Sequence, residues 1–223
     1  MLLFLKSTSR TVHHCHEEEG VLQYKNYSSD DHEEASCVSL TVWTKSLVFS
    51  CKGFTVIGPQ GNLVYRVDNY TGRPDQTLLM DGSGNPIFTI CRRKKLRLVV
   101  DNYWQVYEGE MGNNDIDSSS KKPVFCVRKN TSIVMRTKPS VLAYVSGGIL
   151  SEKGHTYTVE GSYVHRSCKI LDETRRVVSE IKKKEALPGG VSFGLEVFDL
   201  VVKPGIESRF AMAVVILLDQ MFS

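Results

Sequence analysis

The stretch "RFAMAVVILLDQMFS" (Arg209–Ser223) is the strongest indication of the fold in this sequence. Pro204-Gly205 ends the segment before it, Glu207-Ser208 favours a helix start, and the Ala, Met and Leu residues that follow favour helix, so we expect a helix over about 206–222. Within it lies a run without any polar side chain, which consists of Phe210, Ala211, Met212, Ala213, Val214, Val215, Ile216, Leu217 and Leu218. Residues of a helix are about 100° apart, so this run covers the whole circumference. Such a helix must be enclosed by protein or by lipid.

The length of the apolar run argues against lipid. At about 1.5 Å per residue it spans roughly 14 Å, about half of a bilayer core, and the charged Asp219 follows directly. We therefore predict no transmembrane segment and a helix buried in a protein core. Burial of these side chains contributes on the order of 15–25 kcal/mol as an upper bound, which exceeds the net stability of a typical domain. The helix is then obligatory to the fold.

The chain before the helix predicts the enclosure. From Leu40 to about residue 204 it consists of short runs rich in β-branched and aromatic residues, including "SLVFS" (46–50), "GFTVIG" (53–58), "NLVYRV" (62–67), "HTYTVEGSY" (155–163) and "FGLEV" (193–197). Gly-rich turns, "GPQGN" (58–62) and "DGSGNP" (81–86), separate neighbouring runs and favour hairpins. About ten to twelve such runs predict a mainly β body, either a barrel or a sandwich.

Charge divides the chain into two predicted parts. The formal net charge is +3, but residues 1–39 carry seven acidic and three basic side chains and the remainder is basic. The leader lacks apolar periodicity, so we expect a flexible acidic segment over 1–38 and a single domain over 39–223. A moderately basic body suits an anionic partner such as a lipid headgroup or a nucleic acid.

Residue patterns that accompany catalysis or metal binding are missing from the sequence. The six cysteines form no CxxC pair, and the adjacent ligands of "HHCHEEE" (13–19) lack the separation of a tetrahedral site. His165 and Cys168 differ by an odd number, so in a strand they face opposite sides. Asn114–Asp117 has two carboxylates but lacks the glycine and distal glutamate of an EF-hand. We predict no metal, no cofactor and no enzymatic activity.

The N-terminal residues and the cysteines bear on the compartment. "MLLFLKSTSR" has four apolar residues after Met1, fewer than a secretory signal needs, and scattered thiols suit a reducing environment. We expect an intracellular, cytoplasmic protein, with a peripheral position at the plasma membrane or a nuclear one as alternatives. We also expect a monomer.

Long motifs in the expected order resemble the LURP-one-related proteins of plants. They are "LTVWTKSLVFSCKGFTVIGPQGNLVYRVDNY", "LLMDGSGNPIFTICRRKKLRL", "WQVYEGE", "EGSYVHRSCKILDE", "EIKKKEA" and "RFAMAVVILLDQMF". The resemblance implies a tubby C-terminal-like fold, in which a closed antiparallel barrel of about twelve strands surrounds a hydrophobic C-terminal helix. This fold is shared with the tubby domain and the phospholipid scramblases. The implied helix is the one that the apolar run predicts independently.

The resemblance implies two classes of function. Tubby domains bind phosphatidylinositol bisphosphate and act as membrane-tethered transcription regulators, scramblases act on membrane lipids, and the LURP-one group is associated with plant defence. The first hypothesis is therefore binding of phosphoinositide or another anionic membrane lipid. The alternative is a protein-interaction scaffold or regulator without lipid binding. Nucleic-acid binding ranks below both, because Trp43 and Trp104 lie in strand-like runs and are expected in the core.

A lipid-headgroup site needs several basic side chains on one exposed patch. Two runs are the candidates: "CRRKKLRL", with Arg92, Arg93, Lys94, Lys95 and Arg97, and "EIKKKE", with Lys182, Lys183 and Lys184. In the first run we expect Arg93, Lys95 and Arg97 on the outer face of a strand, with Arg92 and Lys94 in a turn. In the second run Lys182 and Lys184 lie opposite Ile181. Both runs also fit an ordinary solvated barrel surface.

Overall fold

A computed structural model describes residues 36–49, 51–69, 76–93, 103–112, 122–131, 140–147, 157–186, 190 and 192–223. The chain divides into two units, Met1–Glu34 and Ala35–Ser223, and the described residues belong to the second. Of the predicted flexible leader over 1–38, residues 1–35 lie outside the described residues, and so do the segments "HHCHEEE" and 114–117; the last leader residue, Val38, starts a strand.

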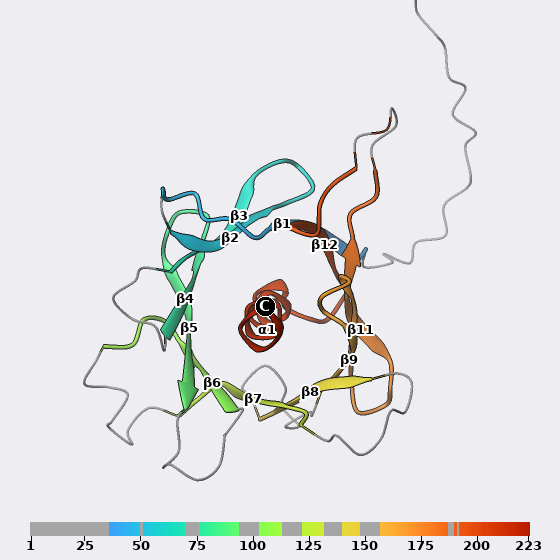
Figure 1. Cartoon of the computed structure of the whole chain (residues 1–223). Coiled ribbons are helices and arrows are strands. Elements are labelled where there is room, and N and C mark those ends of the chain that lie inside the picture. Colours follow the sequence, from blue (N-terminus) through green and yellow to red (C-terminus); the bar gives the residue numbers. More distant parts are fainter. Residues whose placement is uncertain are drawn as a thin grey trace, which may run out of the picture. The chain divides into compact units, whose positions relative to one another are not determined.

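In the described part of the chain, twelve antiparallel strands form one closed barrel, and a single helix lies inside it (Figure 1). The strands are β1 (Val38–Trp43), β2 (Lys52–Ile57), β3 (Leu63–Asn69), β4 (Gln76–Asp81), β5 (Pro86–Arg93), β6 (Tyr103–Glu108), β7 (Phe125–Lys129), β8 (Val141–Ser146), β9 (Tyr157–Ser162), β10 (Ser167–Leu171), β11 (Val177–Lys183) and β12 (Val197–Val202). Each pairs with its neighbours in sequence, and pairing of β1 with β12, from Val38↔Val202 to Trp43↔Val197, closes the ring. The predicted fold class is confirmed.

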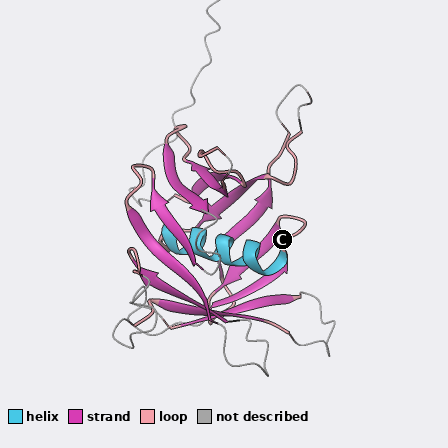
Figure 2. Cartoon of the chain, turned by 60° about the vertical axis from the view of Figure 1, so that its left-hand side comes forward, coloured by secondary structure: helices cyan, strands magenta, loops and turns pink. Residues whose placement is uncertain are grey.

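The helix, α1 (Ser208–Phe222), runs through the middle of the barrel (Figure 2). Every side chain from Phe210 to Leu218 is buried, as is Met221. They pack against the inward side chains of the strands; the Phe210 ring, for example, contacts those of Phe125 and Tyr157 at centroid distances of 5.1 and 5.0 Å. Enclosure by protein is thus confirmed. Among the described residues, no helix is both long and apolar enough to cross a membrane.

Two short runs predicted as strands are connections instead. The described part of "SLVFS" forms bends between β1 and β2, and Phe49 is 96% exposed. In "FGLEV" only Val197 belongs to a strand, because the carbonyl of Gly194 accepts a hydrogen bond from the Val197 amide and closes a turn. A run of β-branched and aromatic residues suits the surface of a sheet, but a strand forms only where a neighbouring strand is in place to pair with it.

The predicted placement of the tryptophans is half correct. Trp104 is 1% exposed in the core, whereas Trp43 is 39% exposed. In β1 the inward side chains are Leu40 and Val42, so the alternation of the strand directs Trp43 outward. The prediction for Trp43 is wrong for this reason.

The antiparallel order gives the barrel two distinct ends. The odd-numbered strands all finish at one end of the barrel, and the even-numbered strands all finish at the other. α1 starts at the second end, directly after β12. It finishes at the first end, where Tyr163 in the β9–β10 turn bonds to Asp219 and Lys129 at the end of β7 bonds to Met221.

Candidate functional site

The first basic run starts inside a strand. Arg92 belongs to β5, pairs in register with Trp104 and is exposed, so the prediction that it lies in a turn is wrong. It has the same strand parity as the inward-facing Phe88 and Ile90, and its guanidinium lies 5.4 Å from the centroid of the Trp104 ring. Arg93 is the last residue of β5. Lys94, Lys95 and Arg97 lie outside the described residues, so their predicted orientation stays a prediction.

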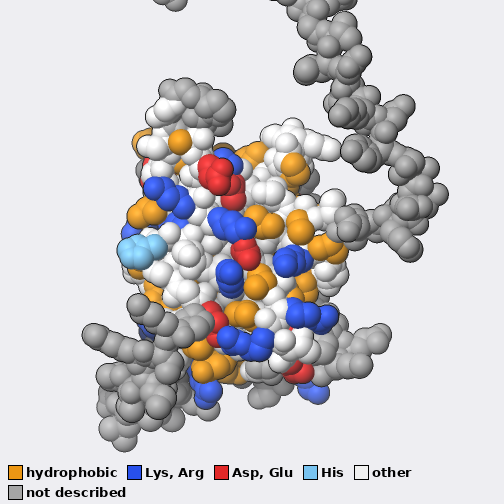
Figure 3. Space-filling model, turned by 90° about the vertical axis from the view of Figure 1, so that its right-hand side faces the viewer, with side chains coloured by type: hydrophobic (Ala, Val, Ile, Leu, Met, Phe, Trp, Pro, Cys, Tyr) orange, Lys and Arg blue, Asp and Glu red, His pale blue; other side chains and the backbone are white. Residues whose placement is uncertain are grey.

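The second basic run lies at the end of β11 and after it. Lys182 is exposed and forms an ion pair with Glu180 at 2.5 Å, while Lys184 forms one with Asp199 at 2.7 Å and also bonds to Thr41. Lys183 is exposed. Figure 3 shows the side of the barrel that contains β11 and β12, where basic, acidic and apolar side chains alternate. Two of the three lysines therefore already have acidic partners.

The barrel does not bring the described residues of the two runs together into one pocket. In the closed ring five strands separate β5, which contains Arg92 and Arg93, from β11, which contains Lys182 and Lys183, in either direction, so the two strands lie on opposite sides of the barrel (Figure 1). These residues nevertheless share one end of the barrel, because both strands are odd-numbered. The common feature of the described candidates is thus the end of the barrel.

Counting the charges on the described residues separates the two ends. We count each connection together with the two adjoining residues of every strand or helix. At the end that follows odd-numbered strands, ten basic residues stand against the acidic Asp68, Glu185 and Glu196; the basic ones are Lys45, Lys52, Arg92, Arg93, Arg128, Lys129, Arg166, Lys182, Lys183 and Lys184. At the other end five basic residues stand against six acidic ones. We refer to these as the basic end and the acidic end.

Exposed apolar side chains also gather at the basic end. Six large hydrophobic side chains are exposed among the described residues, and five of them lie there: Trp43, Leu47, Phe49, Val164 and Leu195. The sixth, Val38, starts β1 at the acidic end. Exposed hydrophobic residues that occur singly need no explanation, but a group of them at one end indicates an interaction surface.

Hydrogen bonds join the segments that carry these side chains. The amide of Thr44 donates to the Glu196 carbonyl at 2.9 Å, and Nε of Arg166 donates to the Leu195 carbonyl at 2.8 Å. Arg166 also lies over the rings of Tyr163 and Phe198, at 4.2 and 4.5 Å. The β1–β2 connection, the segment before β12 and the β9–β10 turn therefore form one continuous surface with cations inside it.

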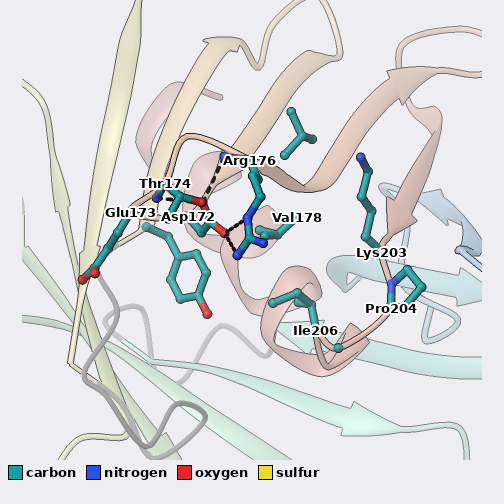
Figure 4. A pocket seen from close by; sticks show the side chains of 11 residues that line it. Asp172, Glu173, Thr174, Arg176, Val178, Lys203, Pro204 and Ile206 are labelled. Atoms are coloured by element: carbon teal, nitrogen blue, oxygen red, sulfur yellow. Dashed lines mark hydrogen bonds and ion pairs between the residues drawn. The ribbon is translucent and has the colours of Figure 1, made fainter. Parts of the chain in front are cut away.

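A cavity of about 810 Å³ opens at the acidic end. Tyr157, the β10–β11 turn and residues 203–206 line it (Figure 4). Its Asp172 carboxylate accepts hydrogen bonds from Thr174 and Arg176, and the bond from the Thr174 side chain contributes most to lowering the Asp172 pKa to about 2. This carboxylate thus holds the turn together, and Lys203 lies on the other side of the cavity.

The described histidine and cysteine that lie closest in sequence do not form a reactive pair. His165 is exposed in the β9–β10 turn, whereas Cys168 is 2% exposed inside β10. Burial raises the pKa of the Cys168 thiol to about 12, which keeps it protonated and weakly nucleophilic. No group of three or more His, Cys, Asp or Glu residues suited to a metal occurs within the described ranges.

Comparison with known proteins matches almost the whole barrel. The sequence pattern of a family described as LURP-one-related matches residues 38–219. Among curated Arabidopsis thaliana proteins, LURP-one-related 17 is 44% identical, and the match covers 100% of both chains. LURP-one-related 8 is 48% identical over 85% of this chain and 92% of its own. LURP-one-related 5 is 40% identical over 82% and 83%.

A solved X-ray structure of an Arabidopsis thaliana protein has the same fold. It superposes with a TM-score of 0.54 at 22% sequence identity, covering 82% of this chain and 90% of that one. At this level of identity the likeness concerns the fold alone.

Proposed function

Because the chain belongs to the LURP-one-related family, we propose that it is a non-enzymatic barrel whose basic end binds the anionic surface of a membrane, with phosphoinositides as the preferred lipids. The difference in charge between the two ends carries the proposal: the basic end has ten basic and three acidic residues, whereas the acidic end has five basic and six acidic residues. A Lys or Arg near an anionic leaflet contributes about 1 kcal/mol, so several together suffice for reversible attachment.

The filled interior of the barrel supports a binding function over a catalytic one. Side chains of α1 fill the barrel, so the space that lipocalin-like barrels offer to a ligand is occupied by the protein's own helix. The Cys168 thiol is buried and the Asp172 carboxylate holds a turn, as described above. A regulatory role in defence, which the resemblance implies, fits a protein that is recruited to a membrane surface.

Charge reversals matched between the two ends test the proposal. Lys52 and Lys183 are exposed at the basic end, and Lys122 and Lys203 are exposed at the acidic end. Reversal of either pair to Glu changes the net charge equally. We expect the purified chain to sediment with phosphatidylcholine vesicles that contain phosphatidylinositol bisphosphate, and not with phosphatidylcholine alone. The Lys52→Glu/Lys183→Glu variant should bind roughly tenfold or more weakly, and the Lys122→Glu/Lys203→Glu variant about as well as the parent.

Equal losses in both variants would show a response to net charge alone and would contradict the proposal, as would an unmodified chain that ignores the vesicles. A second candidate function is an interaction scaffold, which the cavity at the acidic end favours because charged side chains such as Arg176 and Lys203 line it together with apolar ones. A partner whose capture survives Lys52→Glu/Lys183→Glu and is lost with Lys203→Glu would support that alternative.

A further inference from the structure

The connection between β1 and β2 carries the most exposed large apolar side chain among the described residues, together with a second one. Phe49 is 96% exposed and Leu47 is 53% exposed. A Phe side chain that remains in water forgoes the favourable free energy of burial, which makes this position costly for a surface without a partner. We refer to residues 44–49 as the apolar loop.

Hydrogen bonds within the barrel fix the base of the apolar loop. The Ser46 hydroxyl donates a hydrogen bond to the Asp68 carboxylate and accepts one from the Val48 amide at 2.9 Å. Asp68, whose side chain is 1% exposed, is held in turn by Nε of Arg66 at 2.8 Å. The Thr55 hydroxyl donates to the Lys45 carbonyl at 2.7 Å. Because the buried side chains of Thr55 and Asp68 hold Lys45 and Ser46, the tip of the loop, with Leu47 and Phe49, projects from an ordered support.

The backbone of β2 is shaped to receive this base. A methyl group added at Gly53 would lie 1.7 Å from the Val67 carbonyl oxygen and 3.3 Å from Cβ of Ser46. Only glycine fits at position 53, because any side chain would collide with the Val67 carbonyl. Because Gly53 has no side chain, Ser46 can approach β3 closely. The loop is thus held near the barrel at its base and free at its tip.

Cations surround the base of the loop. The Lys45 ammonium lies 5.3 Å from the centroid of the Trp43 ring, and Lys52 is the first residue of β2. Arg166 donates a hydrogen bond to the Leu195 carbonyl, and the neighbouring Glu196 carbonyl accepts one from the Thr44 amide at the start of the loop. Cations and an aromatic ring below an apolar tip match the order of layers in a bilayer, where phosphates lie outside the acyl chains. This charge complementarity argues for an anionic bilayer over a neutral apolar protein surface.

We propose that the apolar loop inserts Leu47 and Phe49 between the lipids of an anionic membrane, while Lys45, Lys52 and Arg166 contact the phosphates. The inference rests on the proposed function and deepens it, because it assigns the depth and orientation of attachment: the basic end faces the bilayer and the barrel axis points toward it. A membrane bound by charge alone would leave both side chains in water.

The test compares a polar loop with a matched control at the other end of the barrel. Leu47→Ser/Phe49→Ser removes the tip, and Val38→Ser removes an exposed apolar side chain, 44% exposed, at the acidic end. With vesicles of phosphatidylcholine, phosphatidylserine and phosphatidylinositol bisphosphate, we expect the loop variant to bind about tenfold more weakly and the control to bind as the parent does. Both should keep the parental melting temperature, since the changed side chains are exposed.

A fluorescent probe reports insertion directly. In Phe49→Trp, vesicles should shift the emission to the blue, and brominated lipid acyl chains should quench it more than they quench the unmodified chain with Trp43 and Trp104. The inference is overturned if the loop variant binds the vesicles as well as the parent does. It is also overturned if brominated lipids quench the emission of Phe49→Trp no more than they quench the emission of the unmodified chain. If Lys52→Glu/Lys183→Glu still weakens binding in that case, the proposed function stands without loop insertion. Loss of dimers in the loop variant by sedimentation velocity would assign the loop to contact between two copies and would also overturn it.

Discussion

The phenolic hydroxyl of Tyr163 donates a hydrogen bond to Oδ1 of Asp219 at 3.0 Å, which joins the β9–β10 turn to the only carboxylate of the buried helix. Asp219 also accepts the Ser223 hydroxyl at 2.7 Å. The charge that ends the apolar run is thus half-buried and satisfied by hydrogen bonds. α1 can therefore remain inside the barrel up to its last turn.

Replacement of Tyr163 by Phe should destabilise the barrel by about 1–3 kcal/mol, because Asp219 loses a donor in a partly buried site. The measurement is the free energy of unfolding from urea titration. Asp219→Asn together with Tyr163→Phe should cost less than the sum of the two single changes, since the unpaired charge is gone. Strict additivity would show that the hydrogen bond contributes nothing.

Removal of the helix should abolish the fold. A chain that ends after Pro204 loses every buried side chain of α1 and leaves the inward faces of twelve strands without a core. We expect insoluble or unfolded protein without a cooperative melt. A soluble, monomeric truncated protein that melts cooperatively would contradict the enclosure argument.

Lys129 should stabilise the carboxyl end of α1. Its ammonium donates to the Met221 carbonyl at 2.5 Å and lies 4.3 Å from the centroid of the Phe222 ring, where a helix presents unpaired carbonyls and partial negative charge. Lys129→Met should lower stability by about 1–2 kcal/mol, or roughly 2–8 °C in melting temperature. Lys183→Met, which removes an exposed lysine at the same end, serves as the control and should change little.

Stability should fall as the pH rises above about 9. The unfolded Cys168 thiol ionises near 9, whereas burial raises its folded pKa to about 12, so the folded state binds more protons between these values. The stabilising contribution is complete below 9 and is lost toward 12, at up to about 1.4 kcal/mol per pH unit.

Denaturant titrations between pH 8 and 10.5 test the assignment to this thiol. Cys168→Ala should show a shallower decline in the free energy of unfolding than the parent, because it lacks the group that loses its proton on unfolding. Burial also raises the pKa of Tyr163, which adds to the decline above about 10 in both proteins. Parallel curves would contradict the assignment to Cys168.

The fold could be predicted because its signals are local. The apolar circumference of the run from Phe210 to Leu218 excludes a surface helix, and turns such as "GPQGN" mark hairpins through glycines with positive φ, including Gly61 at 79°. Where a strand-like run lacked a partner, prediction failed. Leu47 and Phe49 have β-forming side chains, but Ser46 bonds to Asp68 and turns the backbone away from the ladder.

The amino-acid pattern alone predicts that a helix without a polar face is enclosed by a strand-rich chain, since periodicity depends on neighbours within a few residues. The arrangement of the charges follows only from the folded barrel. Closure of the ring puts β5 and β11 on opposite sides, so Arg92 and Lys183 share an end and do not share a pocket. The same closure gathers Trp43, Val164 and Leu195 at that end from segments far apart in the chain. Antiparallel pairing alternates the direction of the strands, and this alternation sorts the connections between the two ends.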